Sequence, residues 1–388
     1  GDEVYYEAYR QSLRGFYYMR IGEPATQLRP VPRQPRFIPN VDPPDFRIYL
    51  TDITPMDEEF RSYHADTWDE PHHVDKAEDS LFWKRRLPGN PTNNNAIGGH
   101  SDAFDWDRHL SHVVHIYDLL LPYLLSGGEL NDDNLGIRES GNGIPDLIDE
   151  ARQQADFFLS LRQGEAYCHG LTNPCKQQKV MFQTGPTTIA AWANAANCAI
   201  LADALRICGR PDLMQHYCRE AISAFEFATL QTPHQLDYLQ DIGDAVMRGR
   251  DFRAMAAAFL YNVTGDPIWE QAFAEDCIAT DKPDQPIQDT TSWSQLWSTA
   301  AYLLCPHSIH FPELKSRLLL RIERDAMELQ VARIAERPSR RASINNHWQS
   351  AENMQAVLIA HRVSKSADAR ARMESAMWNE ASWGLGRN

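Results

Sequence analysis

The chain has 388 residues, 43% of them hydrophobic and 23% charged, which is the composition of a globular protein with a large buried core. Its formal net charge of −15 argues against non-specific nucleic-acid binding, which depends on patches of lysine and arginine. No run of about 18 apolar residues occurs, so we expect no membrane span and no membrane partner. A strongly negative chain suits a neutral or cationic ligand, and it equally suits simple solubility.

The first hundred residues carry an irregular region over residues 21–97. It begins with the proline-rich run "QLRPVPRQPRFIPNVDPPD", which must be extended or looped. A polar stretch with scattered tryptophan and histidine follows it. Long irregular segments within a compact domain are usually functional or disordered, and this one leads directly into a cluster of aspartates.

From about residue 108 onward the pattern predicts helices joined by short loops. In "GIPDLIDEARQQADFFLSLRQG", Pro145 suits the first helical turn and Gly164 supplies the stop. No sustained alternation of apolar and polar residues indicates a strand, so the sequence predicts an all-α chain of paired antiparallel helices. The predicted helical segments are residues 106–125, 143–164, 187–209, 211–230, 248–266, 289–306, 311–330, 350–363 and 368–386.

The aspartate cluster lies in "GGHSDAFDWDRH", residues 98–109. Asp102 and Asp105 are three residues apart, so on a helical turn they share a face. Neighbouring carboxylates raise each other's pKa, which suits a shared water or proton. The alternative is a capped junction, in which Asp102 or Asp105 is the N-cap of the helix predicted from residue 106.

Other polar groups allow two interpretations each. Asp132, Asp133 and Asn134 resemble half of a calcium loop, and they equally suit a capped turn before a helix. The frequent histidines, among them His100, do not form a zinc-binding motif and suit a surface or cleft better than a metal site. Tryptophans near carboxylates suggest a platform for sugars, although each one alone is more typical of a core.

Several motifs together resemble a known family. The run "NDDNLGIRESGNGIPDLIDEARQQADFFLSLR" closely resembles a segment of glycoside hydrolase family 9, the cellulase family, in which the pattern continues through E-S-G-N-G-I-P-D. The preceding "GGHSDAFDWDRH" resembles the family's G-G-W-x-D-A-G-D motif. Further segments are similar in the same order, namely "GPTTIAAWANAANCAILADALRI", "HWQSAENMQAVLIAHRV" and the terminal "WGLGRN".

The resemblance implies an (α/α)6 barrel and inverting hydrolysis of β-1,4-glycosidic bonds. It implies that Asp105 is the catalytic base and that Asp102 helps to hold the attacking water. The two glycines would let this loop reach the floor of the cleft. Trp348 matches a sugar-stacking tryptophan of the family. We also expect substrate contacts from Trp106, His100 and His347.

The chain departs from the family pattern at Ser101, which precedes the first aspartate, and at Phe104 and Gln349. Phe104 and Gln349 replace glycines, which predicts a narrower cleft that favours chain ends or short oligosaccharides. The family's catalytic acid is a glutamate beyond the motif that ends at Asn388, and Glu352, Glu374 and Glu380 do not match it. We therefore expect residues 1–388 to form one catalytic domain that lacks the family's C-terminal segment.

The favoured substrate is a β-1,4-glucan or its oligosaccharides, as for a cellulase or endoglucanase in polysaccharide degradation. One alternative is an exo-β-D-glucosaminidase that acts on chitosan-type oligosaccharides. A second is a barrel that binds carbohydrate without catalysis. We expect no required cofactor and no metal in the site; whether a structural calcium is bound is left open. A secreted or periplasmic location is favoured, and a cytoplasmic one is retained.

Overall fold

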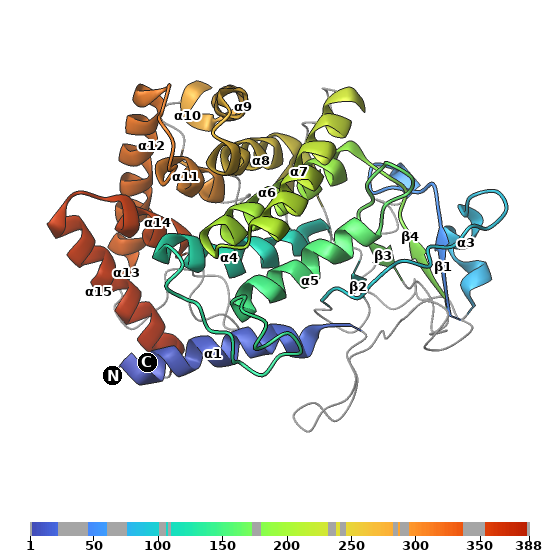
Figure 1. Ribbon diagram of the computed structural model, residues 1–388, viewed down its shortest axis with the longest axis horizontal. Helices are drawn as coiled ribbons and strands as arrows, with labels where there is room; N and C mark the ends of the chain where they lie inside the picture. The colour runs from blue at the N-terminus through green and yellow to red at the C-terminus, as the bar shows by residue number, and fades with distance from the viewer. Residues whose placement is uncertain are drawn as a thin grey trace.

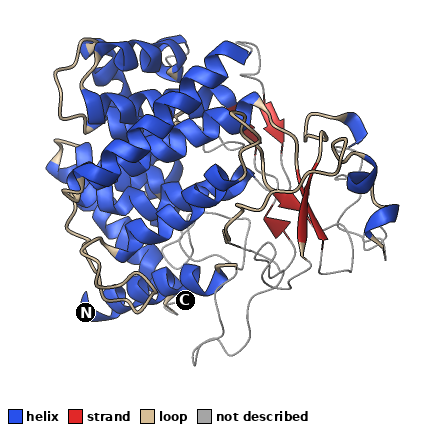
Figure 2. Ribbon diagram, turned by 45° about the vertical axis from the view of Figure 1, so that its right-hand side comes forward, coloured by secondary structure: helices blue, strands red, loops and turns tan. Residues whose placement is uncertain are grey.

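The computed structural model describes residues 2–21, 46–59, 76–100, 106–107, 110–172, 180–231, 238–240, 246–281, 286–287, 295–336 and 354–385. These residues form a layered bundle of helices with a small lobe of strands on one side (Figures 1 and 2). The predicted fold class, all-α with the architecture of an (α/α)6 barrel, is confirmed. Within the described ranges, no helix is both long enough and apolar enough to cross a membrane.

Inner and outer helices alternate along the chain. Each inner helix packs against the next inner one, and the last also packs back on the first. The inner helices are α4 (Val114–Ser126), α6 (Thr188–Ile207), α8 (Gly249–Thr264), α11 (Leu296–Leu303) and α14 (Gln355–Val363). Each is followed by an outer helix that packs on it, and these are α5 (Asp146–Ser160), α7 (Pro211–Gln231), α9 (Pro267–Asp276), α12 (Pro312–Asp325) and α15 (Ala367–Gly384).

The sequence explains which helices lie inside. Nearly every residue of α6 is buried, as expected for a helix that is apolar on most sides and rich in alanine. The outer helix α12 is amphipathic, with Leu318 buried and Leu320 exposed to solvent. Full burial of each large apolar side chain contributes roughly 1.5–3 kcal/mol, so the inner ring supplies most of the hydrophobic stabilisation.

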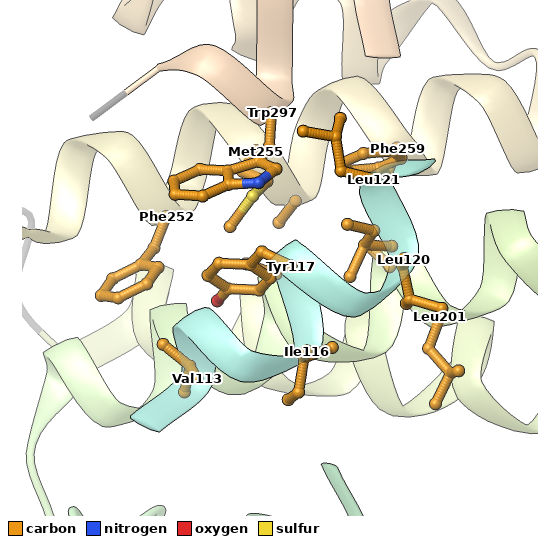
Figure 3. Close-up of a cluster of buried hydrophobic side chains, with 14 of the residues drawn as sticks. Val113, Ile116, Tyr117, Leu120, Leu121, Leu201, Phe252, Met255, Phe259 and Trp297 are labelled. Atoms are coloured by element: carbon orange, nitrogen blue, oxygen red, sulfur yellow. The ribbon is translucent and has the colours of Figure 1, made fainter. Parts of the chain in front are cut away.

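The centre of the ring is an aromatic and aliphatic cluster. Figure 3 shows Tyr117 of α4 facing Phe252 and Met255 of α8 and Trp297 of α11. The rings of Tyr117 and Trp297 have their centroids 5.4 Å apart. The Tyr117 hydroxyl donates a 2.6 Å hydrogen bond to the Asn197 amide oxygen of α6. Tyr117 therefore links its own helix α4 to α6 by a hydrogen bond and to α11 by ring packing.

Short strands accompany the helices, although the sequence shows no sustained alternating pattern that indicates them. A four-stranded sheet has the order β1 (Arg47–Leu50), β4 (Val180–Gln183), β3 (Leu171–Thr172) and β2 (Trp106–Asp107). The β1–β4 pair is parallel and the other pairs are antiparallel. A hairpin joins β5 (Tyr238–Gln240) to β6 (Val246–Arg248). Strands of two to four residues are too short to show an alternating pattern in the sequence.

A first helix, α1 (Asp2–Met19), was not predicted either. It lies along α5, and the two ends of the described chain meet, as Figure 1 shows for α1 and α15. The Tyr5 hydroxyl shares a 2.7 Å hydrogen bond with Ser382, and the Tyr5 and Trp378 rings pack edge to face. Because α1 is rich in tyrosine and charged residues, its apolar face is hard to detect from the sequence.

The shorter elements complete the chain. They are η2 (Ala77–Asp79), α3 (Leu81–Lys84), η3 (Leu110–Val113), α10 (Ile278–Asp281), the π-helical turn η4 (Ala326–Val331) and α13 (Ala332–Glu336). Most predicted helices agree with the structure to within a few residues. The prediction of a helix from residue 106 is wrong at its start, because residues 106–107 are a strand and α4 begins at Val114. Val113 is the N-cap of α4, so neither Asp102 nor Asp105 caps that helix.

Candidate active site

The candidate site centres on the segment that contains Asp102 and Asp105. Both aspartates, together with His347 and Trp348, lie outside the described residues. The structure describes the chain on both sides of the aspartates, through His100 before them and from Trp106 after them. His100 and strand β2 are the two anchors described on either side of this segment.

The first anchor is the side chain of His100, which is fully buried. Its backbone N–H donates to the Gln154 amide oxygen at 3.0 Å, and its Nδ1 lies 2.7 Å from the same oxygen. Its Nε2 lies 2.5 Å from Oε1 of Glu150. Because the backbone N–H of His100 donates to Gln154, the atom of the Gln154 amide that faces His100 must be its oxygen. Each ring nitrogen of His100 therefore faces an acceptor oxygen, one from Gln154 and one from Glu150.

Arg20 completes this anchor from the end of α1. Its guanidinium donates two hydrogen bonds of 2.9 Å to the two carboxylate oxygens of Glu150 and another of 2.9 Å to Glu139. Burial alone raises the pKa of Glu150, but hydrogen bonds and charges from His100 and Arg20 outweigh burial and lower that pKa below its ordinary value. Glu150 is therefore ionised at neutral pH, and its charge is neutralised within the protein.

The two glycines before His100 have a packing role. A Cβ on Gly98 would lie 2.1 Å from the backbone oxygen of Ile21, and one on Gly99 would lie 2.8 Å from the Phe157 ring. The Ile21 N–H also donates to the Gly99 carbonyl at 2.8 Å. The resemblance suggested that the glycines let the loop reach the cleft floor. In the structure they let the backbone lie directly on the end of α1 and on α5.

The second anchor is strand β2, which begins at the residue after Asp105. Trp106 pairs with Thr172 of β3, and Asp107 pairs with Leu171. The sheet is tied to α5 through the fully buried Gln183 of β4, whose Nε2 donates to the carbonyl of Leu161 at 2.7 Å. His100 therefore contacts α5 directly, and strand β2 is linked to the end of α5 through the sheet.

Two further histidines adjoin the first anchor. His112 and His115 lie one turn apart where η3 meets α4, and their rings stack with centroids 5.4 Å apart. The His100 ring meets His115 edge to face at 6.1 Å. Among the residues that the structure describes, no three histidine, cysteine or acidic side chains are grouped so that they could hold a metal ion.

The ring of inner helices holds one more titratable group. Burial raises the pKa of Asp118 on α4 to about 7, and hydrogen bonds from Gln355 on α14 and Trp297 on α11 oppose that rise. Its Oδ1 has no hydrogen-bond partner within the described part of the chain. This carboxyl therefore changes its charge near neutral pH inside the helical ring.

The predicted residues divide into three groups. The structure gives no geometry for four of them, Asp102, Asp105, His347 and Trp348. For Trp106 it gives only the strand pairing. His100 is enclosed by Glu150 and Gln154, and its predicted contact with substrate stays a prediction.

Three residues were missed as parts of the site, namely Arg20, Glu150 and Gln154. Glu150 lies in the "ESGNGIPDLIDEAR" motif, so the motif itself was the signal for it. The turn in this motif is capped by Asp133, which accepts backbone hydrogen bonds from Gly141 and Gly143. The capped-turn interpretation of this stretch is therefore confirmed.

A ring in which inner and outer helices alternate is the architecture of an (α/α) barrel. The family description that matches the chain is glycosyl hydrolase family 9, over residues 5–388. The chain belongs to this family, and the resemblance drawn from its motifs is confirmed.

Solved structures give the same fold. A metagenome-derived glycoside hydrolase family 9 endoglucanase is 19% identical, with a TM-score of 0.68 over 99% of this chain and 66% of that chain. A family 9 protein of Bacteroides ovatus is 16% identical, with a TM-score of 0.66 over 99% and 69%. The family 9 endoglucanase J30 is 18% identical, with a TM-score of 0.69 over 100% and 68%. The chain thus spans about two thirds of the length of these structures, and at such identities the likeness shows the fold. No match is found among curated protein sequences.

Proposed function

We propose that this chain belongs to an inverting glycoside hydrolase that cleaves β-1,4-glycosidic bonds of glucans or their oligosaccharides. Asp105 acts as the general base that deprotonates the attacking water, and Asp102 helps to hold that water. The observation that carries the proposal is membership of family 9 across residues 5–388, which includes the D-A-x-D match at Asp102 and Asp105.

The two anchors support this assignment on physical grounds. A general base must hold the water within hydrogen-bonding reach, and a misplacement of about 1 Å can lower the rate by about 10²-fold. Supporting hydrogen bonds are what keep such a group in place. Here Glu150 and Gln154 hold the chain two residues before Asp102, and the pairing of Trp106 with Thr172 holds it immediately after Asp105.

The reaction class fixes the stereochemistry of the product. In an inverting glycosidase the acid and the base are about 6.5–9.5 Å apart, which leaves room for the water between base and sugar. Water then attacks the face opposite the leaving group, so a β-linkage gives an α-configured sugar as the first product. Trp348 and Trp106 would stack on the apolar faces of the sugar, with His347 beside them.

The test is proton NMR of the first product that the intact protein releases from β-1,4-linked glucose oligomers, with glucosamine oligomers assayed in parallel. The α-anomer is expected first. Asp105→Asn is expected to lose at least about 10² in kcat, since positioned proton transfer typically contributes that much. Asp107→Asn, two residues after Asp105 in strand β2, is the matched control and is expected to retain activity.

The β-anomer as first product would contradict the inverting mechanism. Full turnover by Asp105→Asn would contradict the assigned base. Turnover of glucosamine oligomers alone would replace the glucan by an amino sugar, and no turnover of either series would favour a barrel that binds carbohydrate without catalysis.

A further inference from the structure

A pocket of about 310 Å³ lies at the N-terminus of the inner helix α6. Thr187 and Thr188, at that terminus, line it together with Phe227 near the end of α7. The loop after β1 contributes Thr54 to another side. The described lining includes no predicted catalytic or substrate-contacting residue and no residue of the two anchors. The proposal below therefore does not depend on the proposed function.

Backbone hydrogen bonds fix the walls of this pocket. The Gly185 N–H donates at 2.7 Å to the carbonyl of Ile53, which joins the turn before α6 to the loop after β1. The Thr187 N–H donates at 3.0 Å to the carbonyl of Tyr167. The Tyr167 ring packs edge to face on Phe227, with the ring centroids 5.7 Å apart. The pocket is therefore preformed, as is usual for small-molecule sites.

The N-terminus of α6 presents two backbone donors that lack acceptors. The N-cap Thr187 accepts from the N–H of Ala190 through its side chain and from the N–H of Ala191 through its carbonyl. The N–H groups of Thr188 and Ile189 have no acceptor within the described residues. Both lie at the positive end of a 20-residue helix, where an anion is favoured.

The side chain of Thr188 is a third donor. Thr188 is 6% exposed and lines the pocket, and its hydroxyl has no hydrogen-bond partner in the part of the chain that the structure describes. The hydroxyl can be reached from the pocket, because the fully enclosed polar atoms without a partner do not include Thr188 Oγ1. A nearly buried hydroxyl beside two free N–H groups marks a place where an acceptor is expected.

Apolar groups form much of the remaining wall. Phe227 contributes a half-buried ring, and Met56, Pro186 and Ala166 contribute further apolar surface. An engineered apolar cavity of about 150 Å³ holds benzene, so about 310 Å³ accommodates a six-membered ring with a substituent. No charged side chain is among the described lining residues.

We propose that this pocket binds an organic carboxylate whose body is about the size of a six-membered ring. The carboxylate accepts hydrogen bonds from the N–H groups of Thr188 and Ile189 and from the Thr188 hydroxyl. The body of the ligand contacts Phe227 and the apolar surface beside it. The ligand thus supplies the acceptors that the three free donors lack and covers the exposed apolar wall.

Acidic side chains adjoin the loop after β1. Arg85 pairs with three of them, Asp52, Asp57 and Glu59. Asp57 also accepts from the N–H and the hydroxyl of Thr54, at 2.7 and 2.9 Å. These partly exposed charges are screened over about 8 Å at physiological salt. They lower the affinity for an anion, and they provide no acceptor for the donors of α6.

The competing explanation is hydration. Water accepts from the first N–H groups of many helices, so it could also accept from Thr188 and Ile189. That explanation predicts no saturable binding of a carboxylate, and it gives Phe227 no role.

The experiment is NMR titration of the intact protein with benzoate, compared with benzamide, which lacks the charge, and with acetate, which lacks the ring. Saturable binding of benzoate is expected, with the amide signals of Thr188 and Ile189 shifting together. Each comparator is expected to bind at least about tenfold more weakly, because charge-assisted hydrogen bonds are stronger than neutral ones and acetate loses the apolar contact.

Thr188→Val keeps the shape of the side chain and removes the hydroxyl, so it is expected to weaken benzoate binding by about five- to tenfold. Thr229→Val is the matched control. Thr229 is exposed on α7, and its hydroxyl donates to the carbonyl of Phe225 at 2.8 Å. That control is expected to leave binding unchanged.

A second variant keeps the test decisive if Thr188→Val fails to fold. Ala166→Trp fills the pocket from one side and is expected to abolish binding while the circular dichroism of the helices is retained. Absence of saturable benzoate binding to the wild type, or binding that leaves the Thr188 and Ile189 signals unmoved, would overturn the proposal. Equal affinity for benzoate and benzamide, or unchanged affinity in Ala166→Trp, would also overturn it. Tighter binding of methyl β-glucoside at the same two amides would replace the carboxylate by a neutral sugar.

Discussion

Nε2 of His100 lies 2.5 Å from Oε1 of Glu150, and both side chains are removed from solvent. The two residues come from segments 50 positions apart, one of them directly before the aspartates and the other in the middle of the family's most extended motif. This contact gives the motif a physical role, because Glu150 holds the loop that precedes the proposed base. It also provides the first prediction.

Glu150→Gln is expected to destabilise the protein by about 3–5 kcal/mol, because it leaves Arg20 buried without its main counter-charge. Urea unfolding measures the change. Glu139→Gln removes a second partner of Arg20 that is 22% exposed, and a smaller loss is expected there. An equal loss in the two variants would contradict the central role of Glu150.

Gly98→Ala is expected to lower stability, since its Cβ would meet the backbone oxygen of Ile21 at 2.1 Å and backbone cannot move aside cheaply. The matched control is Gly15→Ala within α1, where an added Cβ meets nothing within 4 Å. That control is expected to gain about 0.5–1 kcal/mol, the difference between alanine and glycine in a helix. Thermal unfolding measures the stability of both variants. Unchanged stability of Gly98→Ala would contradict the prediction, because it would show that the backbone at Gly98 can move away from Ile21 at little cost.

Asp118 predicts a specific dependence of stability on pH. Its folded pKa is raised to about 7, whereas an aspartate in an unfolded chain titrates near 4. Between about pH 4 and about pH 7 the folded protein retains a proton that the unfolded chain has lost. The free energy of unfolding therefore falls as the pH rises through this window, by at most about 1.4 kcal/mol per pH unit.

Asp118→Asn removes that titration, so its stability relative to the wild type is expected to increase from about pH 5 to about pH 8. Denaturant titrations across this range provide the measurement. Asp79→Asn, at an exposed position, is the control and is expected to show no such trend. Parallel stability curves for the wild type and Asp118→Asn would mean that this carboxyl titrates normally.

Tyr117→Phe is expected to cost about 1–3 kcal/mol, because it leaves the buried amide oxygen of Asn197 without its donor. The ring and its packing against Trp297 are kept, so the loss reports the hydroxyl alone. A double-mutant cycle with Asn197→Val isolates the pair. If the two single losses simply add, the hydrogen bond contributes no coupling and the prediction is wrong.

The sequence predicts the barrel well because its helices are long and strongly patterned, as in α6, where burial is nearly complete. The sequence did not predict α1, because its many tyrosines and charged residues make its apolar face hard to detect. It did not predict the strands either, because they are only two to four residues long. Asp102 and Asp105 could be proposed as catalytic residues from the sequence because the D-A-x-D spacing is local. The partnership of His100 with Glu150 and Arg20 was not recognisable, because no local pattern encodes a contact between segments 50 and 130 residues apart.

The same separation has a kinetic consequence. Arg20, His100 and Glu150 can meet only after the end of α1, the loop and α5 have come together, and closing such long stretches of chain is slow compared with forming a helix. During refolding, the helical signal is therefore expected to return before the contacts of Arg20 and His100 with Glu150 form. The helices would then form first, and the buried cluster of Arg20, His100 and Glu150 would form later.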